Sequence, residues 1–185
     1  MSKTSFYNQK ELEELGLKSF GKKVLISRNA RFYGAENIEL GDNVRIDDFC
    51  ILSGKVTLGS HIHIAAGSYF FAGNAGVEME DFSGLSGRCS VYAVSDDYSG
   101  EVMTNATIDN KFKNAIEKKV LIKKHSLIGT GSTILPDVII AEGCSVTAMS
   151  LINKSTEPWG VYVGSPARRV KETEGKLNGM PNWRK

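Results

Sequence analysis

The chain has 185 residues and a formal net charge of +2, and 41% of its residues are hydrophobic. This length lets one domain bury a continuous core without disulfide or metal staples, and the near balance of charge argues against a broad nucleic-acid surface. No run of eighteen apolar residues predicts a membrane span, no apolar signal segment opens the chain, and three cysteines without paired spacing suit a reducing cytoplasm. We expect a cytoplasmic protein without a membrane span.

The first segment, residues 1–23, is predicted to form a cap that contains a short helix. Ser5 is a suitable N-cap, Leu12 and Leu15 are apolar, and Gly16 ends the pattern. The open end of a repeat fold needs such a cap, so we expect the helix to cover it.

From residue 24 to residue 171 the dominant feature is an apolar residue at every sixth position. The two unbroken blocks are Leu40, Ile46, Leu52, Leu58, Ile64 and Phe70, then Ile122, Ile128, Ile134, Ile140, Val146 and Ile152. Four residues after most of them comes a small or β-branched residue. A six-residue repeat is too short for a helix or a hairpin, but it fits one short strand plus one corner of a three-sided coil. We therefore predict an all-β, parallel β-helix rather than an antiparallel sandwich.

The stacked three-sided coils form a prism. Two interruptions of the repeat predict where the chain leaves it. Nine residues separate Phe70 from Met79, which predicts a bulge over residues 71–76. The repeat resumes at Met79, Leu85 and Val91 and then stops, and residues 96–118 read as a polar loop that leaves the prism. A loop of this length in a compact fold is usually functional. For the polar tail, residues 172–185, the sequence predicts no particular structure.

Three runs near the end of the chain carry a family resemblance. They are LIGTGS (127–132), LPDVII (135–140) and PWGVYVGSPAR (158–168). These runs resemble the hexapeptide-repeat acyltransferases over about residues 24–171. The resemblance implies a left-handed parallel β-helix that works as a homotrimer and uses acetyl-CoA as its cosubstrate.

Two further runs, RIDDFC (45–50) and DDYSGE (96–101), are similar to acetyltransferases of bacterial surface-polysaccharide pathways such as O-antigen synthesis. These include enzymes that acetylate the amino group of dTDP-4-amino-4,6-dideoxyglucose. The resemblance therefore implies a small-molecule sugar acceptor linked to a nucleotide.

The candidate proton acceptors are His63, Asp96 and Asp97. Acetyl transfer needs a group that takes the proton of the nucleophile and donors for the tetrahedral oxyanion. The galactoside and xenobiotic branches of the family carry a catalytic histidine at the start of the loop, whereas residues 94–98 here contain none. His63 precedes Ile64 on an outer face, and the two aspartates start the loop. We expect them on different faces, so that neighbouring chains of a trimer bring them together.

We also expect one outer face, carrying Ile51, Tyr69 and His63, to be covered in that trimer. The other two histidines, His61 and His125, fall at corners, where solvated side chains are expected.

The candidate residues for CoA lie on the last coils and in the segment that follows them. They are Gly131, Ala148, Trp159, Arg168, Arg169 and Lys171. The basic cluster suits phosphates, although it also fits a solvated basic face. The two small residues would let the pantetheine arm run close to the backbone. The tryptophan either stacks on adenine or covers the end of the prism.

The cysteines argue for direct transfer. Cys50, Cys89 and Cys144 all occupy the small inward position, so a covalent acyl-cysteine is not expected. A zinc site of the carbonic anhydrase type is not expected either, because His61 and His63 point in different directions and ligands must converge.

Three functions remain open from the sequence. N-acetylation of a nucleotide-linked amino sugar is favoured, because an amine is the stronger nucleophile and the loop histidine is missing. O-acetylation of a sugar hydroxyl, as in galactoside acetyltransferases, is the enzymatic alternative. A structural solenoid without CoA is the third, and the closing motif at residues 164–168 argues against it.

Overall fold

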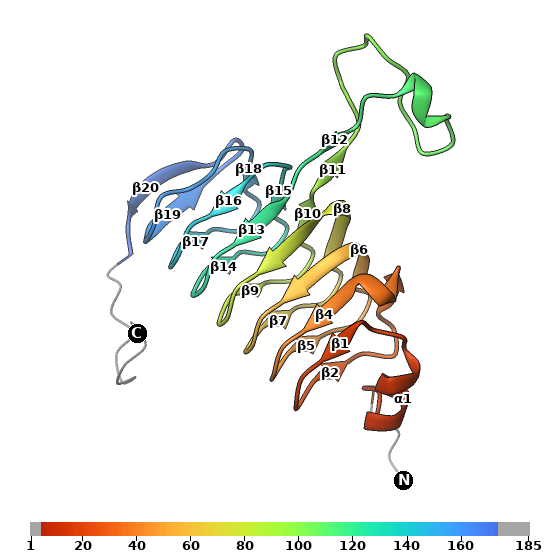
Figure 1. Ribbon diagram of the computed structural model, residues 1–185. Helices are drawn as coiled ribbons and strands as arrows, with labels where there is room; N and C mark the ends of the chain where they lie inside the picture. The colour runs from red at the N-terminus through yellow and green to blue at the C-terminus, as the bar shows by residue number, and fades with distance from the viewer. Residues whose placement is uncertain (1–4, 174–185) are drawn as a thin grey trace.

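The computed structural model describes residues 5–173, and these fold into the predicted parallel β-helix (Figure 1). Short strands stack along one axis and form three faces. The N-terminal helix lies at one end of the prism, and the last two strands close the other. Among the described residues, no helix is long and apolar enough to cross a membrane.

The first face, face A, is a separate sheet of eight strands, and all of them are parallel except the last. In spatial order they are β2 (Leu25–Ile26), β5 (Arg45–Ile46), β7 (His63–Ile64), β9 (Gly84–Leu85), β14 (Leu127–Ile128), β17 (Ser145–Val146), β19 (Gly160–Val163) and β20 (Arg168–Glu172).

The other two faces form one sheet, because β6 (Ile51–Leu58) and β8 (Tyr69–Met79) continue around the corner between them. Face B contains the second halves of β6 and β8 with β1 (Ser19–Phe20), β4 (Ile38–Leu40), β13 (Val120–Ile122) and β16 (Ile139–Ile140). Face C contains their first halves with β3 (Arg31–Tyr33), β10 (Ser90–Tyr92), β15 (Thr133–Ile134) and β18 (Leu151–Ile152).

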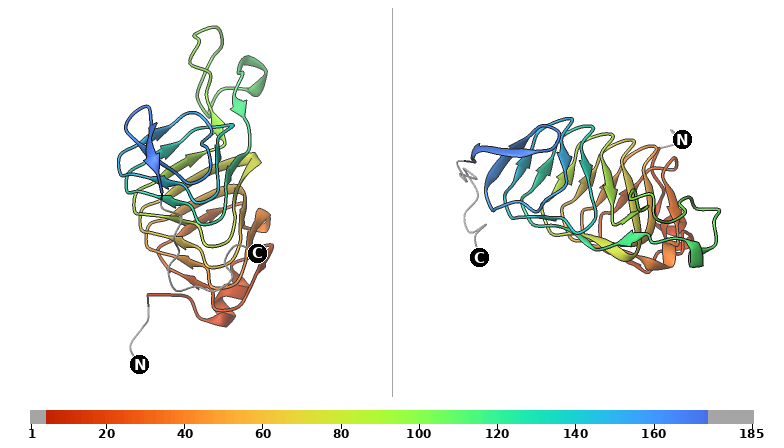
Figure 2. Two further views of the ribbon diagram at one scale, coloured as in Figure 1. Left: turned by 90° about the vertical axis from the view of Figure 1, so that its left-hand side faces the viewer. Right: turned by 90° about the horizontal axis from the view of Figure 1, so that it is seen from above.

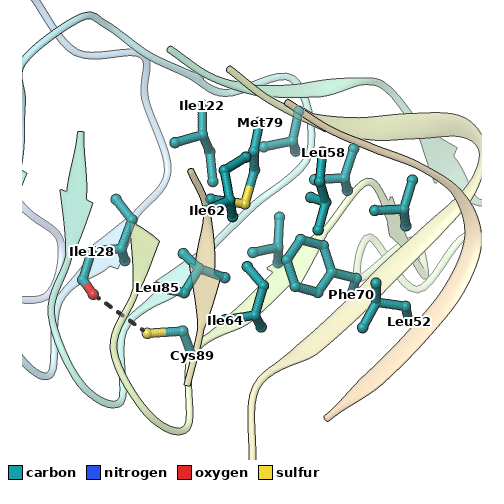
Figure 3. Close-up of a cluster of buried hydrophobic side chains, with 14 of the residues drawn as sticks. Leu52, Leu58, Ile62, Ile64, Phe70, Met79, Leu85, Cys89, Ile122 and Ile128 are labelled. Atoms are coloured by element: carbon teal, nitrogen blue, oxygen red, sulfur yellow. Dashed lines mark hydrogen bonds between the residues drawn. The ribbon is translucent and has the colours of Figure 1, made fainter. Parts of the chain in front are cut away.

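The core is a column of aliphatic side chains that point into the prism (Figure 3). Every residue of the two predicted six-residue blocks is buried. Their small partners are buried as well, among them Cys50, Ser68, Ser126, Ser132 and Cys144. Each coil thus removes its apolar face from water only by stacking on the next coil.

The corners use the left-handed backbone region, which explains the many glycines. Gly54 has φ 87°, and a Cβ there would lie 2.4 Å from the carbonyl oxygen of Gly73. Only glycine tolerates both conditions. Other corners hold large residues at positive φ, including Phe49, His61, Phe82 and Met149, which is uncommon for bulky side chains.

The N-terminal helix exists, but it begins later than predicted. Helix α1 (Gln9–Glu14) is capped by Asn8 and not by Ser5. The side chain of Asn8 accepts from the amide of Glu11 at 3.1 Å, and the Glu11 carboxylate accepts from the amide of Asn8 at 2.8 Å. This reciprocal capping box satisfies two helix-end donors. The carbonyl of Ser5 instead accepts from the amide of Arg28. Leu12 is buried against the core, as expected for a cap.

Both predicted interruptions of the repeat are present. The pairing of β6 with β8 shifts register on both sides of Gly54, so β8 bulges there. The long loop leaves the prism after face C and projects far from it (Figures 1 and 2). Its base is an antiparallel ribbon of β11 (Val94–Ser95) and β12 (Ile116–Glu117).

Two short 3-10 helices complete the described chain. They are η1 (Ala35–Asn37) and η2 (Asn110–Phe112), and the second lies within the loop. Of the tail predicted at residues 172–185, Glu172 ends β20, and residues 174–185 lie outside the described part.

One prediction about the outer surface is wrong. Ile51 and Tyr69 are register partners on face C, whereas His63 pairs with Arg45 on face A. Each six-residue step turns the chain onto the next face, so residues share a face only when whole coils separate them. His63 lies twelve residues after Ile51 and therefore cannot share its face.

Candidate active site

His63 belongs to a hydrogen-bonded group on face A. Its Nε2 lies 2.7 Å from Oδ2 of Asp47, and Oδ1 of Asp47 accepts from Nε of Arg45 at 2.7 Å. The side chain of His63 is 54% exposed, whereas that of Asp47 is only 19% exposed. The strand register that pairs Arg45 with His63 positions all three groups on adjacent coils.

The carboxylate of Asp47 determines the tautomer of His63. Burial raises the pKa of the Asp47 carboxyl, but the hydrogen bonds from His63 and Arg45 lower it, and the net pKa lies below its ordinary value. Asp47 is therefore ionised at neutral pH and can only accept. Nε2 of a neutral His63 must then carry the proton, which leaves Nδ1 as a free acceptor.

The surface beside His63 is open on the side away from Asp47. Its register partner on the next strand is Gly84, which has no side chain. Ser86 lies two residues further along the same coil, at the corner between faces A and C. The amide of Ser86 donates to the carbonyl of Ile128, and no described residue forms a hydrogen bond with its hydroxyl. Ser86 therefore lies diagonally across the strand pair from His63, two residues beyond the register partner Gly84, and side chains in this relation are about 7–8 Å apart.

Asp96 and Asp97 both lie at the base of the protruding loop, but their surroundings differ. Asp97 accepts from the amide of Ser99 at 2.7 Å and from the side chain of Asn114 at 3.1 Å. These bonds lower the pKa of its carboxyl, the amide of Ser99 most, so Asp97 acts as a tie within the loop. The carboxylate of Asp96 has no hydrogen bond or ion pair among residues 5–173. The geometry favours Asp96 over Asp97 as the group that meets a ligand.

The predicted basic cluster is only partly available for an anion. Arg169 forms ion pairs with Glu157 at 3.2 Å and Glu172 at 3.1 Å. Arg168 lines a surface hollow of about 330 Å³ together with Lys154, and Arg169 forms part of its wall. Lys171 lies on β20 and has no ion pair within the described residues. The hollow combines two unpaired cations, a suitable setting for a phosphate.

The other predicted CoA residues have mixed accessibility. Ala148 is exposed. The side chain of Met149 lies over Gly131, since a Cβ on Gly131 would be 2.6 Å from the Met149 sulfur. The ring of Trp159 lies over Gly143, where a Cβ would be 2.2 Å from the indole. One face of the indole thus covers the prism corner.

The three cysteines are free thiols in the core. Figure 3 shows Cys89 among the aliphatic side chains, directed at the carbonyl of Ile128. Burial raises the pKa of Cys50 and Cys89, so neither is a ready thiolate nucleophile.

Replacing all three cysteines by alanine is therefore expected to weaken the fold but spare the chemistry. Each replacement removes one buried, methyl-sized group, which costs about 0.5–1.5 kcal/mol. Urea unfolding measures the loss of stability, and kcat of the folded variant should stay within about twofold of wild type. An acetylated cysteine found by mass spectrometry during turnover would contradict this prediction.

The remaining histidines are not bare surface groups. His61 and His125 stack on the two sides of Phe82. The ring centroid of His61 lies 4.8 Å from that of Phe82, and the ring centroid of His125 lies 5.4 Å from it. His61 and His63 therefore have different neighbours, in line with their predicted divergence. Among residues 5–173, no three His, Cys, Asp or Glu side chains come together as a metal site.

Repeat phase could have found part of what the sequence analysis missed. Asp47 follows Ile46 and His63 precedes Ile64, so an eighteen-residue coil places them on neighbouring strands. Ser86 follows the nine-residue slip, which obscures its coil position. Lys154 becomes visible only when the hairpin of β19 and β20 folds back beside it.

A parallel β-helix of six-residue repeats with a loop that leaves one coil is the fold of the hexapeptide-repeat acyltransferases. No protein-family model matches the chain. The dTDP-4-amino-4,6-dideoxy-D-glucose acyltransferase of Escherichia coli is 40% identical over 176 residues, which are 94% of this chain and 91% of that protein. The chain therefore belongs to the family of the dTDP-4-amino-4,6-dideoxyglucose acyltransferases.

Solved structures agree with this assignment. AntD, an N-acyltransferase from Bacillus cereus in complex with dTDP and 3-hydroxybutyryl-CoA, is 49% identical, covers 95% of this chain and 93% of its own, and has a TM-score of 0.93. The hexapeptide-repeat acetyltransferase VCA0836 from Vibrio cholerae is 19% identical, covers 89% of this chain and 81% of its own, and has a TM-score of 0.58. The second comparison shows the fold alone.

Proposed function

We propose that this enzyme transfers the acetyl group of acetyl-CoA to the amino group of a dTDP-linked 4-amino-4,6-dideoxy sugar in the cytoplasm. The observation that carries the proposal is the similarity to AntD along nearly the whole chain. Solved structures of AntD variants contain dTDP-4-amino-4,6-dideoxyglucose and coenzyme A. The free thiols of this chain support a reducing compartment.

The active site is proposed to form between subunits of a homotrimer. Phe49 and Met149 project from the corner between faces A and C and are 64% and 73% exposed. Leu25 and Leu127 expose further apolar surface on face A. These four side chains are spaced along several coils and do not form one patch, and a neighbouring chain is the proposed cover of this edge. Face B, with Glu39, Glu78 and their lysine partners, stays in water.

Ser86 and Asp96 are the proposed key residues of the shared site. Among the AntD structures are variants with one serine or one aspartate replaced, and these two positions lie ten residues apart in that protein. Ser86 and Asp96 have the same spacing here. Ser99 and Asp109 share it, but Asp109 caps η2 and pairs with Lys111 in the exposed loop.

The proposed chemistry is direct transfer. The amine nitrogen attacks the thioester carbonyl, and a tetrahedral oxyanion forms, which hydrogen-bond donors stabilise. The carboxylate of Asp96 takes a proton from the nitrogen. The intermediate then collapses, an amide forms, and the carbon–sulfur bond breaks to release the CoA thiolate, which is protonated. The dyad of His63 and Asp47, with Ser86, binds the acceptor sugar through the open acceptor Nδ1 and the free hydroxyl.

The hollow beside β20 is proposed to hold a phosphate group of CoA. Arg168 and Lys154 supply its positive charge, whereas Glu157 and Glu172 already offset the charge of Arg169. Lys171 lies on the same hairpin and adds to the field.

The test is an assay with defined donors and acceptors. Purified protein is incubated with acetyl-CoA or 3-hydroxybutyryl-CoA and with dTDP-4-amino-4,6-dideoxyglucose, and thiol release is followed with a chromogenic disulfide. We expect turnover with the amino sugar and none with the matching 4-hydroxy sugar. The product should survive mild hydroxylamine, because an amide resists it and an ester does not. Turnover only with the hydroxyl sugar would establish O-acetylation, and absence of CoA binding by calorimetry would revive the structural solenoid.

A further inference from the structure

Glu117 connects the base of the protruding loop to the bulge in β8. Its Oε1 accepts hydrogen bonds from the amides of Asn74 at 2.5 Å and Ala75 at 3.1 Å. Neither amide has a register partner on β6, because the pairing jumps across this stretch. Successive amides that point into one concavity form an anion-binding nest. The carboxylate of Glu117 occupies this nest.

The backbone of the bulge is shaped to receive the ribbon. Gly73 has φ 51°, and a Cβ on it would lie 2.3 Å from Cγ2 of Val94 and 2.7 Å from Oε1 of Glu117. Any other residue would push the ribbon away. The three extra residues that interrupt the repeat thus form the backbone surface against which the base of the loop packs.

The contact of Glu117 with the bulge is close to Asp96 along the ribbon. Glu117 on β12 is the register partner of Val94 on β11, and Val94 is two residues before Asp96. Directly after β12, Lys118 forms an ion pair with Asp137 and Lys119 forms one with Glu78. Both are largely exposed, and such pairs contribute little. The two bonds of Glu117 are exposed as well, but their donors are fixed backbone amides, and charge-assisted hydrogen bonds are stronger than neutral ones.

We propose that Glu117 is a positioning residue that latches the loop onto the bulge of β8 and thereby sets the position of Asp96. This role rests on the proposed function, in which Asp96 meets the acceptor amine. A displacement of about 1 Å at a reacting group can cost 10²-fold in rate. Glu117 itself touches no substrate in this proposal.

The test compares Glu117→Ala, Glu117→Gln and the control Glu101→Ala. Glu101 is an exposed loop carboxylate with no side-chain hydrogen bond or ion pair among the described residues, so its loss removes the same charge. We expect Glu117→Ala to lower kcat by about 10- to 100-fold while KM for acetyl-CoA and the melting temperature change little. The glutamine variant keeps an acceptor oxygen and should recover to within about threefold of wild type.

Hydrogen exchange gives a readout that does not depend on activity. The peptide covering residues 71–76 should exchange faster in Glu117→Ala than in wild type, and at the wild-type rate in Glu101→Ala. Gly73→Ala, which pushes on the same contact from the other side, should reproduce the faster exchange at residues 74 and 75.

Unchanged exchange together with unchanged kcat in Glu117→Ala would overturn the latch, as would an equal loss in the glutamine variant. If wild-type protein transfers no acyl group to the amino sugar, the proposed function fails. The exchange result still decides whether the latch exists.

Discussion

Asp96→Asn is expected to lower kcat for the amino sugar by about 10²–10⁴-fold, the usual contribution of a positioned general base. The carboxylate of Asp96 starts the loop and is not engaged by any described residue, so it is free to take the proton of the amine. Asparagine keeps the shape of the side chain and removes its basicity. Steady-state kinetics with both substrates varied will measure the effect, and KM for acetyl-CoA should be nearly unchanged.

The neighbouring residue offers a matched control. Asp97→Asn keeps an acceptor for the amide of Ser99 and should lower kcat by less than about tenfold. Equal losses in both variants would show that the loop, and not one carboxylate, was disturbed. A change of only a few-fold in Asp96→Asn would mean that another group takes the proton, and the free Nδ1 of His63 would be the next candidate.

Trimers assembled from two impaired variants are expected to regain activity. His63→Ala removes a hydrogen-bond acceptor for the sugar and should lower kcat/KM by about 5- to 150-fold, because a desolvated donor left without a partner costs about 1–3 kcal/mol. In the proposed shared site, His63 comes from one chain and Asp96 from its neighbour. Equal co-expression of His63→Ala with Asp96→Asn should therefore restore about a quarter of the sites, since each neighbour is of the required type half of the time.

The controls for this experiment are each variant co-expressed with a second copy of itself. If both groups of a site belong to one chain, the mixture stays at the average of the two variants. A monomeric mass by light scattering at micromolar protein would rule out the shared site directly.

The periodic part of the fold was predictable because its cause is local. A six-residue step returns the side chain to the core at every strand, so the apolar positions can be identified from the sequence alone. The interruptions were visible for the same reason, since an insertion breaks a strict phase. The start of the helix was missed because two acceptable N-caps, Ser5 and Asn8, lie three residues apart. The choice depended on the reciprocal bonds with Glu11.

Only part of the candidate site could be predicted from the sequence. Residue type and phase drew attention to His63 and Asp96, but their partners depend on register between coils. Asp47 orients His63 because β5 lies beside β7. Asp97, equal to Asp96 in sequence terms, is tied to Ser99 and Asn114 by the folding of the loop. The partners of Arg169 also depend on the folding of the chain, because Glu157 and Glu172 offset its charge only after the chain turns back on itself.

By itself, then, the sequence determined the repeat, the inward and outward sides of each strand and the burial of the cysteines, because every coil buries the same positions of the repeat when it stacks on the next one. The tertiary structure alone decided which outward groups meet. It brought the amides of the bulge to Glu117 and placed Ser86 diagonally across from His63. These pairings depend on stacking between coils eighteen or more residues apart, and no local pattern encodes that geometry.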